Sequence, residues 1–390
     1  MRRRFRTAAP SLVFLLALAG SSHAQDDGVS EDRVLFGQSA VFSGPNGQLG
    51  MDFRIGVLAA FGEANAGGGV HGRRLELLSI DDFYDPAVAV ANTRRLVEQD
   101  RVFALIGSVG APSARAAVPI AAESSVPYIS PYTGSDLLRE RKWSHVINLR
   151  ASYSQETAEI VERIISDLNI RRIAVVHQDD SYGLAGLAGV QRALNERDLS
   201  IATLANYARN TTAVKTAVLE LRGVQPGAVV LVGAHNAVAE TVMWARHIGL
   251  NPVFVTLSFS GGNALASALN DRGLGDVYAT QVVPFPASQT AIARSYRRAM
   301  ARHARNAATG YISFEGYLAG RLTIEGLERA GADLDRVRFL SGLLRGATVN
   351  LDGLVLRFGE GDNQGSNRVY LTRIDDDGRY TPISRLGDDL

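Results

Sequence analysis

The chain has 390 residues, of which 46% are hydrophobic and 21% are charged, and this composition is typical of a globular protein with sizeable cores. Its 41 basic and 40 acidic residues leave a net charge of +1, so no excess of charge indicates binding to nucleic acid or to an anionic membrane. The sequence contains no cysteine, which excludes disulfides, thiol catalysis and cysteine-ligated metals.

The first 24 residues are typical of a secretory signal peptide. A basic segment, 1–6, precedes the apolar run 12–19, and Ser22-His23-Ala24 then places small residues where a signal peptidase reads them. The apolar run is shorter than the roughly 20 residues that a membrane-spanning helix needs. We therefore expect cleavage after Ala24 and export of the mature chain.

Strand and helix patterns alternate along the rest of the chain, and at about 150 residues per domain its length predicts two lobes. The first round has expected strands at 33–42, 73–82, 103–108 and 126–131 and expected helices at 51–66, 86–97 and 112–124. A second round starts near Arg150, with expected strands at 171–180, 200–207, 228–235 and 252–259 and expected helices at 154–168, 184–197, 212–221 and 237–248. Residues 276–285 lead out of the second round, and helices are expected at 288–305 and 313–330. In 351–375 apolar and polar residues alternate, which predicts a β-hairpin. This order predicts an α/β fold of parallel sheets flanked by helices.

The motifs of common enzymes are missing from the chain. Neither Lys142 nor Lys215 follows the glycine pattern of a phosphate-binding loop, and there is no Gly-x-Ser-x-Gly nucleophile elbow. Residues 67–72 match a dinucleotide glycine pattern, but they follow a helix and precede a strand, which is the wrong context. The seven histidines show no metal-binding spacing. We therefore expect no catalysis, no cofactor and no metal.

Six strand ends share small, hydroxyl and aromatic residues. They are 43–45, 110–113, 132–134, 180–183, 234–236 and 258–260. Ordinary turn chemistry explains any one of them, but ligands of parallel α/β sheets bind beyond these strand ends, where helix starts offer free N–H groups. Asp81-Asp82 ends another strand. These two residues either face the ligand-binding cleft expected at the strand ends or form hydrogen bonds with nearby backbone groups. No strand end pairs a nucleophile with a base. Together the six strand ends therefore predict that the protein binds a ligand and leaves it chemically unchanged.

Segments along the whole mature chain resemble the type I periplasmic solute-binding proteins, in particular the Leu/Ile/Val-binding branch that serves ABC importers. They include "VLFGQSAVFSGPNGQLG", "DDFYDP", "ALIGSVGAPS", "VPYISPYTGSDLLR", "NLRASYSQETAEIV" and "TLSFSGGNALASAL". The resemblance implies two lobes joined by three crossovers near Arg150, Val282 and Gly342, with a ligand trapped between them. The first lobe is then 30–150 with 283–342, and the second is 151–282 with 343–390. It also implies a periplasmic monomer that delivers a small molecule to a membrane permease.

The strand ends and the resemblance together predict a set of ligand-binding positions. Backbone N–H groups and hydroxyls come from Gly110, Ala111, Ser113, Thr133 and Gly134, and the walls from Tyr132, Tyr153, Tyr182, His235, Phe259 and Tyr311. Ser43, Leu49 and Ser258 complete the set. The family's hydroxyl is missing at Ala111, so Ser113 or Thr133 takes its role, and the first-loop aromatic falls on Leu49.

The family's ammonium-binding glutamate aligns near Ser258, and no acid occurs from 253 to 263. Asp180 and Glu315 are the two candidates to replace it. Burying an ammonium without a carboxylate partner is costly, so an α-amino acid is a doubtful ligand. A carboxylate without an amine, or a larger apolar or aromatic compound, fits these residues better. Two alternatives keep the fold: a carrier of lipid-like cargo between membranes, and a ligand sensor.

Overall fold

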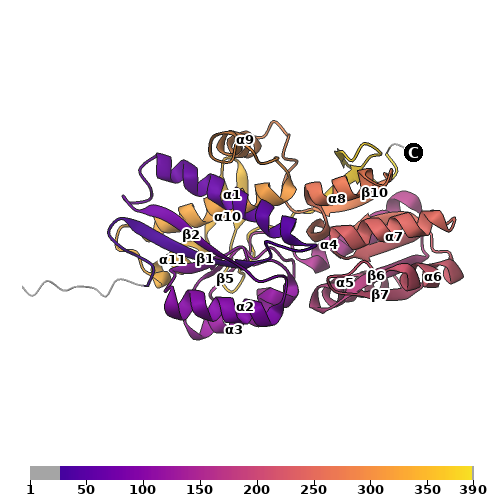
Figure 1. Cartoon of the computed structure of the whole chain (residues 1–390), viewed down its shortest axis with the longest axis horizontal. Coiled ribbons are helices and arrows are strands. Elements are labelled where there is room, and N and C mark those ends of the chain that lie inside the picture. Colours follow the sequence, from indigo (N-terminus) through magenta and orange to yellow (C-terminus); the bar gives the residue numbers. More distant parts are fainter. Residues whose placement is uncertain (1–26, 389–390) are drawn as a thin grey trace, which may run out of the picture.

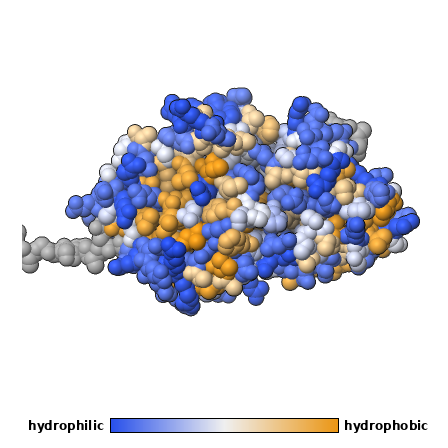
Figure 2. All heavy atoms as spheres, viewed as in Figure 1, coloured by the Kyte–Doolittle hydropathy of each residue, from blue (hydrophilic) through white to orange (hydrophobic). Residues whose placement is uncertain are grey.

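Two lobes lie side by side along the long axis of the molecule in the computed structural model (Figure 1). The structure describes residues 27–388, so the predicted signal peptide and its cleavage after Ala24 lie outside the described residues. Within this range no helix combines the length and apolar character that crossing a membrane requires. Figure 2 shows side chains of intermediate hydropathy along the line where the two lobes meet.

The first lobe is built on a five-stranded parallel sheet. Its strands are β1 (Arg33–Ala40), β2 (Arg74–Asp81), β3 (Ala104–Ile106), β4 (Tyr128–Ile129) and β5 (Val146–Ile147), in the order β2-β1-β3-β4-β5. Its helices are α1 (Gly47–Ala66), α2 (Pro86–Arg94), the π-helical turn η1 (Arg95–Gln99), α3 (Ala111–Glu123), the 3₁₀ turn η2 (Asp136–Arg139), α9 (Ala291–His303), α10 (Tyr311–Ala330) and α11 (Arg336–Leu344).

The second lobe is built on a seven-stranded sheet in the order β14-β13-β10-β9-β8-β6-β7. Its strands are β6 (Ile173–Asp179), β7 (Leu204–Ala208), β8 (Ala228–Val232), β9 (Val253–Thr256), β10 (Val277–Gln281), β13 (Tyr370–Ile374) and β14 (Tyr380–Ile383). Its helices are α4 (Tyr153–Leu168), α5 (Ser181–Asn195), α6 (Lys215–Val224), α7 (His235–His247), the 3₁₀ turn η3 (Ser258–Ser260) and α8 (Gly262–Asn270). At one edge β13 pairs antiparallel with both β10 and β14, and the other neighbouring strands of this sheet are parallel.

Local sequence explains where the elements start and how they pack. All five residues of β8, "AVVLV", are buried, as expected of a central strand that helices cover on both faces. Helix α4 begins with a capping box, in which Ser152 and Gln155 each satisfy the other's backbone N–H. Asp85 caps α2 directly before Pro86, whose missing N–H costs nothing at a helix start.

The chain passes between the lobes in three places. The first passage, 148–152, joins β5 to α4, and the second, 282–290, joins β10 to α9. The third lies at 358–369, before β13. The first and third passages run side by side: Asn148 N–H donates to the Asn363 carbonyl at 2.8 Å, and Gly365 N–H donates to the Asn148 carbonyl at 2.8 Å.

The third passage differs from the prediction near Gly342. Gly342 lies within α11, which packs on α10, and the hairpin of β11 (Thr348–Leu351) and β12 (Leu354–Arg357) follows it, with β11 also contacting α10. We therefore place the third crossover at 358–369 and propose that residues 343–357 belong with the first lobe. The other predicted lobe boundaries stay predictions.

The C-terminal hairpin expected within 351–375 is wrong. Its first half, β12, pairs with the preceding β11, and its second half, β13, pairs with β10 and β14. Residues 363–365 bond to Asn148, and although Arg357 N of β12 donates to the Gly365 carbonyl at 2.8 Å, β12 and β13 do not pair with each other. Two short helices, α8 and α11, have nine residues each and were not predicted from the sequence.

Candidate functional site

Five buried aromatic rings meet where the two lobes face each other. Tyr132 of the first lobe stacks on Phe259 of the second, with ring centroids 5.4 Å apart. Tyr182 lies 4.5 Å from Phe259, Tyr153 lies 5.1 Å from Tyr182, and Tyr84 stacks on Phe259 at 6.4 Å. We call these five residues the aromatic cluster. It offers flat apolar walls from both lobes.

Two glycines make room for the cluster. Gly110, before α3, has φ +86°, and a Cβ there would lie 2.3 Å from the Tyr84 ring. At Gly134 a Cβ would lie 2.6 Å from the Tyr153 ring. Next to it, Thr133 Oγ1 donates to the Tyr153 hydroxyl at 3.2 Å. The strand ends at 110 and 132–134 therefore reach the cluster because they carry small side chains.

A buried charged cluster lies against the aromatic rings. The Arg150 guanidinium sits over the Tyr132 ring at 5.1 Å, and its side chain is 1% exposed. Its Nη2 donates to Glu156 Oε1 at 3.1 Å and to Ser258 Oγ, and its Nη1 lies 3.5 Å from Glu315 Oε1. Glu156 and Ser258 belong to the second lobe and Glu315, on α10, to the first, so Arg150 connects both.

An acid does approach Ser258, although the local sequence contains none. Glu156, on α4, accepts from Ser258 N at 2.9 Å, from Ser258 Oγ at 3.0 Å and from Thr280 Oγ1 at 2.5 Å. Its carboxylate is thus already paired with Arg150 and saturated by hydrogen bonds. Glu156 therefore brings a carboxylate to Ser258, but its hydrogen-bonding positions are already taken by neighbouring residues.

Burial shifts the pKa values of the charged cluster. It raises the pKa of Glu315 to about 7, because Arg150 compensates the loss of hydration only in part. For Arg150, burial alone lowers the pKa, but the carboxylates of Glu315 and Glu156 outweigh it and raise the pKa above its usual range. The guanidinium therefore stays charged, and Glu315 can change its charge near neutral pH.

The predicted candidate Asp180 serves a local role in the structure. It caps α5, where its Oδ1 accepts from Tyr182 N at 2.9 Å and from Gly183 N at 3.1 Å. Burial raises its pKa from the ordinary value. These bonds fix the first turn of α5 and with it the Tyr182 ring.

Two predicted residues bring unpaired polar atoms to helix starts. His235 opens α7, is buried, and its Nδ1 has no hydrogen-bond partner among the described residues; burial lowers its pKa to about 4, which keeps the ring neutral. Ser113, in the first turn of α3, is also fully buried with an unpartnered Oγ. Ala111, the first residue of α3, is buried beside a 300 Å³ cavity that both lobes line.

Three more predicted residues lie outside the aromatic cluster. Ser43 is exposed in the loop after β1. Leu49 is fully buried in the first-lobe core on α1, which is an ordinary packing position. The Tyr311 ring packs against two rings outside the aromatic cluster, with its centroid 5.3 Å from that of Tyr380 and 6.2 Å from that of Phe285. Ligand binding by the predicted set stays a proposal, and its centre is the aromatic cluster.

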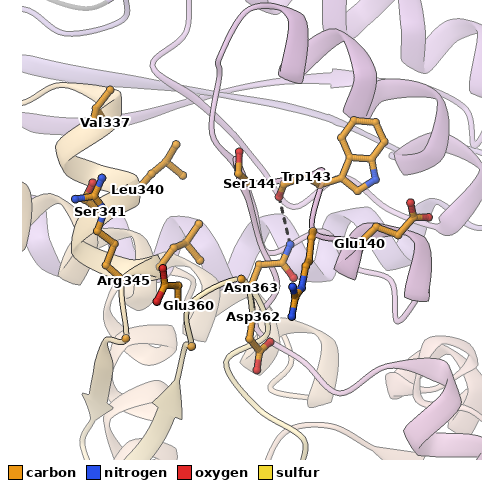
Figure 3. A pocket seen from close by; sticks show the side chains of 15 residues that line it. Glu140, Trp143, Ser144, Val337, Leu340, Ser341, Arg345, Glu360, Asp362 and Asn363 are labelled. Atoms are coloured by element: carbon orange, nitrogen blue, oxygen red, sulfur yellow. Dashed lines mark hydrogen bonds between the residues drawn. The ribbon is translucent and has the colours of Figure 1, made fainter.

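A separate cavity of about 760 Å³ lies beside α11 (Figure 3). Trp143 borders it from the first lobe and Leu340 from α11, and Asn363 Nδ2 donates to the Trp143 carbonyl at 3.4 Å. Charges of both signs, among them Arg345 and Glu360, lie at its edge. No residue of the predicted site lines this cavity, so it is not part of the candidate site.

Sequence reasoning missed Arg150, Glu156 and Tyr84 as site residues. From the sequence, Arg150 is expected only at a crossover, and Glu315 has no expected location in the cleft. A signal for Tyr84 is present in "DDFYDP", where a large ring follows the strand end; both Phe83 and Tyr84 have positive φ, +55° and +59°, which is unusual for such residues. Among the described residues no group of three or more histidines or acids could hold a metal ion.

Comparison with known proteins places this geometry in a family. A model of the family described as periplasmic binding protein matches residues 34–379. The chain belongs to the periplasmic binding proteins. The predicted family and the predicted two-lobed α/β fold are confirmed.

Several relatives of this periplasmic binding protein carry informative names. The crystal structure of a possible leucine/isoleucine/valine-binding protein from Rhodopirellula baltica is 32% identical, covers 93% of this chain and 98% of its own, and has a TM-score of 0.85. An amino acid binding protein of Pseudomonas aeruginosa is 27% identical over 65% of this chain and 67% of its own length. A Leu/Ile/Val-binding protein homolog of Brucella abortus is 24% identical over 80% of this chain and 79% of its own length. These relatives are named as binding proteins and not as enzymes.

Proposed function

We propose that this periplasmic binding protein is the exported solute-binding component of an ABC-type importer and has no catalytic activity. It traps a small ligand with an apolar or aromatic body between its lobes and passes it to a membrane permease as a monomer. The aromatic cluster carries this proposal, because its rings come from both lobes and bury a ligand only when the lobes close. The signal-peptide pattern in residues 1–24 supports export.

The names of the neighbours support a range of ligands. They include branched-chain amino acid binding proteins and, at 18% identity and a TM-score of 0.83, a fatty acid ABC transporter substrate-binding protein from Thermomonospora curvata. The last likeness concerns the fold alone. The ligand class therefore has to come from the residues of the cleft.

A binding screen tests the proposal. The full mature chain is titrated calorimetrically with leucine, valine, 4-methylpentanoate, 3-phenylpropanoate and palmitate. We expect at least one small probe to bind, and Tyr182→Ala to weaken it by at least about tenfold, because a ring in van der Waals contact with the ligand is lost. Tyr370→Ala removes a ring on β13, outside the aromatic cluster, and serves as the control.

Two outcomes contradict the proposal. If no probe binds, or if Tyr182→Ala and Tyr370→Ala bind the same probe equally well, the aromatic cluster is not the ligand site. Binding of palmitate alone would replace the proposal with a carrier of lipid-like cargo.

A further inference from the structure

Arg150 has unused hydrogen-bonding capacity in a fully buried place. Two of its nitrogens, Nε and Nη1, have no hydrogen-bond partner among the described residues, although Nη1 lies 3.5 Å from Glu315. A buried charged donor without a partner is unfavourable, because it has lost its water and gained no bond. An oxygen of a ligand would satisfy these donors.

The unused donors lie where a ligand is expected. The guanidinium carbon is 5.1 Å from the centre of the Tyr132 ring and 6.0 Å from that of Tyr153, two members of the aromatic cluster. Ser258, the position of the family's ammonium-binding acid, already accepts a bond from Arg150. An ammonium group placed there would meet a guanidinium of the same charge.

The acids around Arg150 are not equivalent. Glu156 accepts hydrogen bonds from Arg150, Ser258 and Thr280. The carboxylate of Glu315 makes no hydrogen bond to any described residue, and the ion pair with Arg150 is its one polar contact among them. One guanidinium thus faces two buried carboxylates, of which only Glu315 accepts no hydrogen bond from a described residue.

We infer that Arg150 binds a carboxylate of a ligand that lacks an amino group, and that Glu315 takes up a proton when this carboxylate binds. The inference rests on the proposed function and specifies its ligand: an organic acid with an apolar or aromatic body. The ligand carboxylate takes the unused donors of Arg150, and the protonated Glu315 keeps the total charge of the buried site unchanged. The proton comes from solvent.

The direction of the linkage follows from the charges that face Glu315. These are Arg150 before α4, Glu156 on α4, Arg139 on η2 and the Tyr132 hydroxyl. Burial already raises the pKa of Glu315 to about 7, and a further carboxylate nearby raises it more. The affinity for the ligand carboxylate is therefore highest below pH 7. It falls as the pH rises through 7, by about tenfold from pH 6 to pH 8 for one linked proton.

Calorimetry of the full mature chain tests the inference. We use 4-methylpentanoate and 3-phenylpropanoate, the amides of both acids, and leucine and phenylalanine as the matched amino acids. We expect the acids to bind at least about tenfold more tightly than their amides and amino acids at pH 6, and to bind about tenfold more weakly at pH 8. At pH 8, buffers of different ionisation enthalpy should reveal uptake of close to one proton.

Glu315→Gln is the decisive variant, since it imitates the protonated acid and keeps its shape. We expect it to bind the acids equally well at pH 6 and pH 8, with no proton uptake. Glu325→Gln, which changes a partly exposed acid on the same helix paired with Arg329, should keep the pH dependence of the unchanged protein. A purely structural Arg150–Glu315 pair would not produce this difference.

The outcomes separate this inference from the proposed function. Tighter binding of leucine or an amide than of the acids, or a pH dependence that survives in Glu315→Gln, overturns the inference and leaves the solute-binding function standing. Absence of binding by every acid also overturns it. The proposed function fails separately, if no compound of any class binds.

Discussion

Tyr132 stacks on Phe259 across the junction of the lobes, and its hydroxyl donates to the carbonyl of the preceding residue, Ser258, at 3.3 Å. One side chain of the first lobe thus makes an aromatic and a polar contact with two consecutive residues of the second. Such an aromatic pair contributes about 0.5–1.5 kcal/mol beyond its buried area. Direct contacts between the lobes therefore hold the closed arrangement, and a ligand in contact with both lobes adds to them.

The rim of the cleft offers a test of closure. Asn46 Nδ2, in the loop before α1, donates to Asn210 Oδ1 of the second lobe at 2.9 Å. Asn46→Ala should speed ligand release by about two- to fivefold, because a net hydrogen bond of about 0.5–1 kcal/mol is lost in the closed state. Stopped-flow displacement measures the rate. Asn210→Ala should have the same effect, and the double variant should be no faster than either; additive effects would show that the bond does not hold the lobes together.

Much of the fold and part of the site could be predicted from the sequence, for identifiable physical reasons. Buried parallel strands such as β8 are apolar throughout, so their continuous apolar runs can be recognised in the sequence. Because the carboxyl ends of parallel strands meet at one edge, Tyr132, Tyr182 and Phe259 could be expected to come together, and they do.

The charged cluster could not be predicted, because no local pattern marks it. The cluster combines a crossover residue, Arg150, with one residue from each of two helices, Glu156 and Glu315. In the sequence, none of the three differs from an ordinary charged surface residue. Leu49 lies in the first-lobe core and outside the aromatic cluster, and the sequence could not show this, because an apolar residue in the first turn of a helix packs as well in the core as in a cleft.

The space at Gly134 is a second testable feature. A Cβ there would lie 2.6 Å from the Tyr153 ring and 2.8 Å from its backbone nitrogen, so Gly134→Ala should destabilise the fold by about 1–3 kcal/mol. Gly223→Ala is the control, since a Cβ at that position of α6 meets nothing within 4 Å, and it should stabilise by about 0.4–1 kcal/mol. Urea unfolding of both variants measures the difference, and equal stabilities would show that Tyr153 can move aside.

Arg150 should also be important for stability. Arg150→Met leaves Glu156 and Glu315 buried without the guanidinium between them, and we expect a loss of about 3–5 kcal/mol in the free energy of unfolding at pH 8. Arg163→Met breaks the partly exposed pair with Glu159 on α4 and should cost less than about 1 kcal/mol. Similar losses in the two variants would mean that the buried cluster adds no more than a surface pair.

Asp82 predicts how stability varies with pH. Its side chain is fully buried, and it accepts from Tyr84 N at 2.9 Å and from Ser39 Oγ at 3.4 Å. Burial raises its pKa to about 7, whereas in the unfolded chain an aspartate titrates near pH 4. Between these values the folded state holds a proton that the unfolded state has released, so the contribution of Asp82 to stability falls as the pH rises from about 4 to 7.

Asp82→Asn removes this titration while keeping an oxygen that can accept from Tyr84 N. Relative to the unchanged protein, the variant should therefore gain stability from pH 5 to pH 8, on the order of 2–3 kcal/mol. Asp333→Asn, at a side chain that is 94% exposed, should show no such gain. Urea unfolding at the two pH values measures both. A gain that is the same at pH 5 and pH 8 would show that Asp82 is ionised in the folded protein throughout this range, because its hydrogen bonds then outweigh its burial.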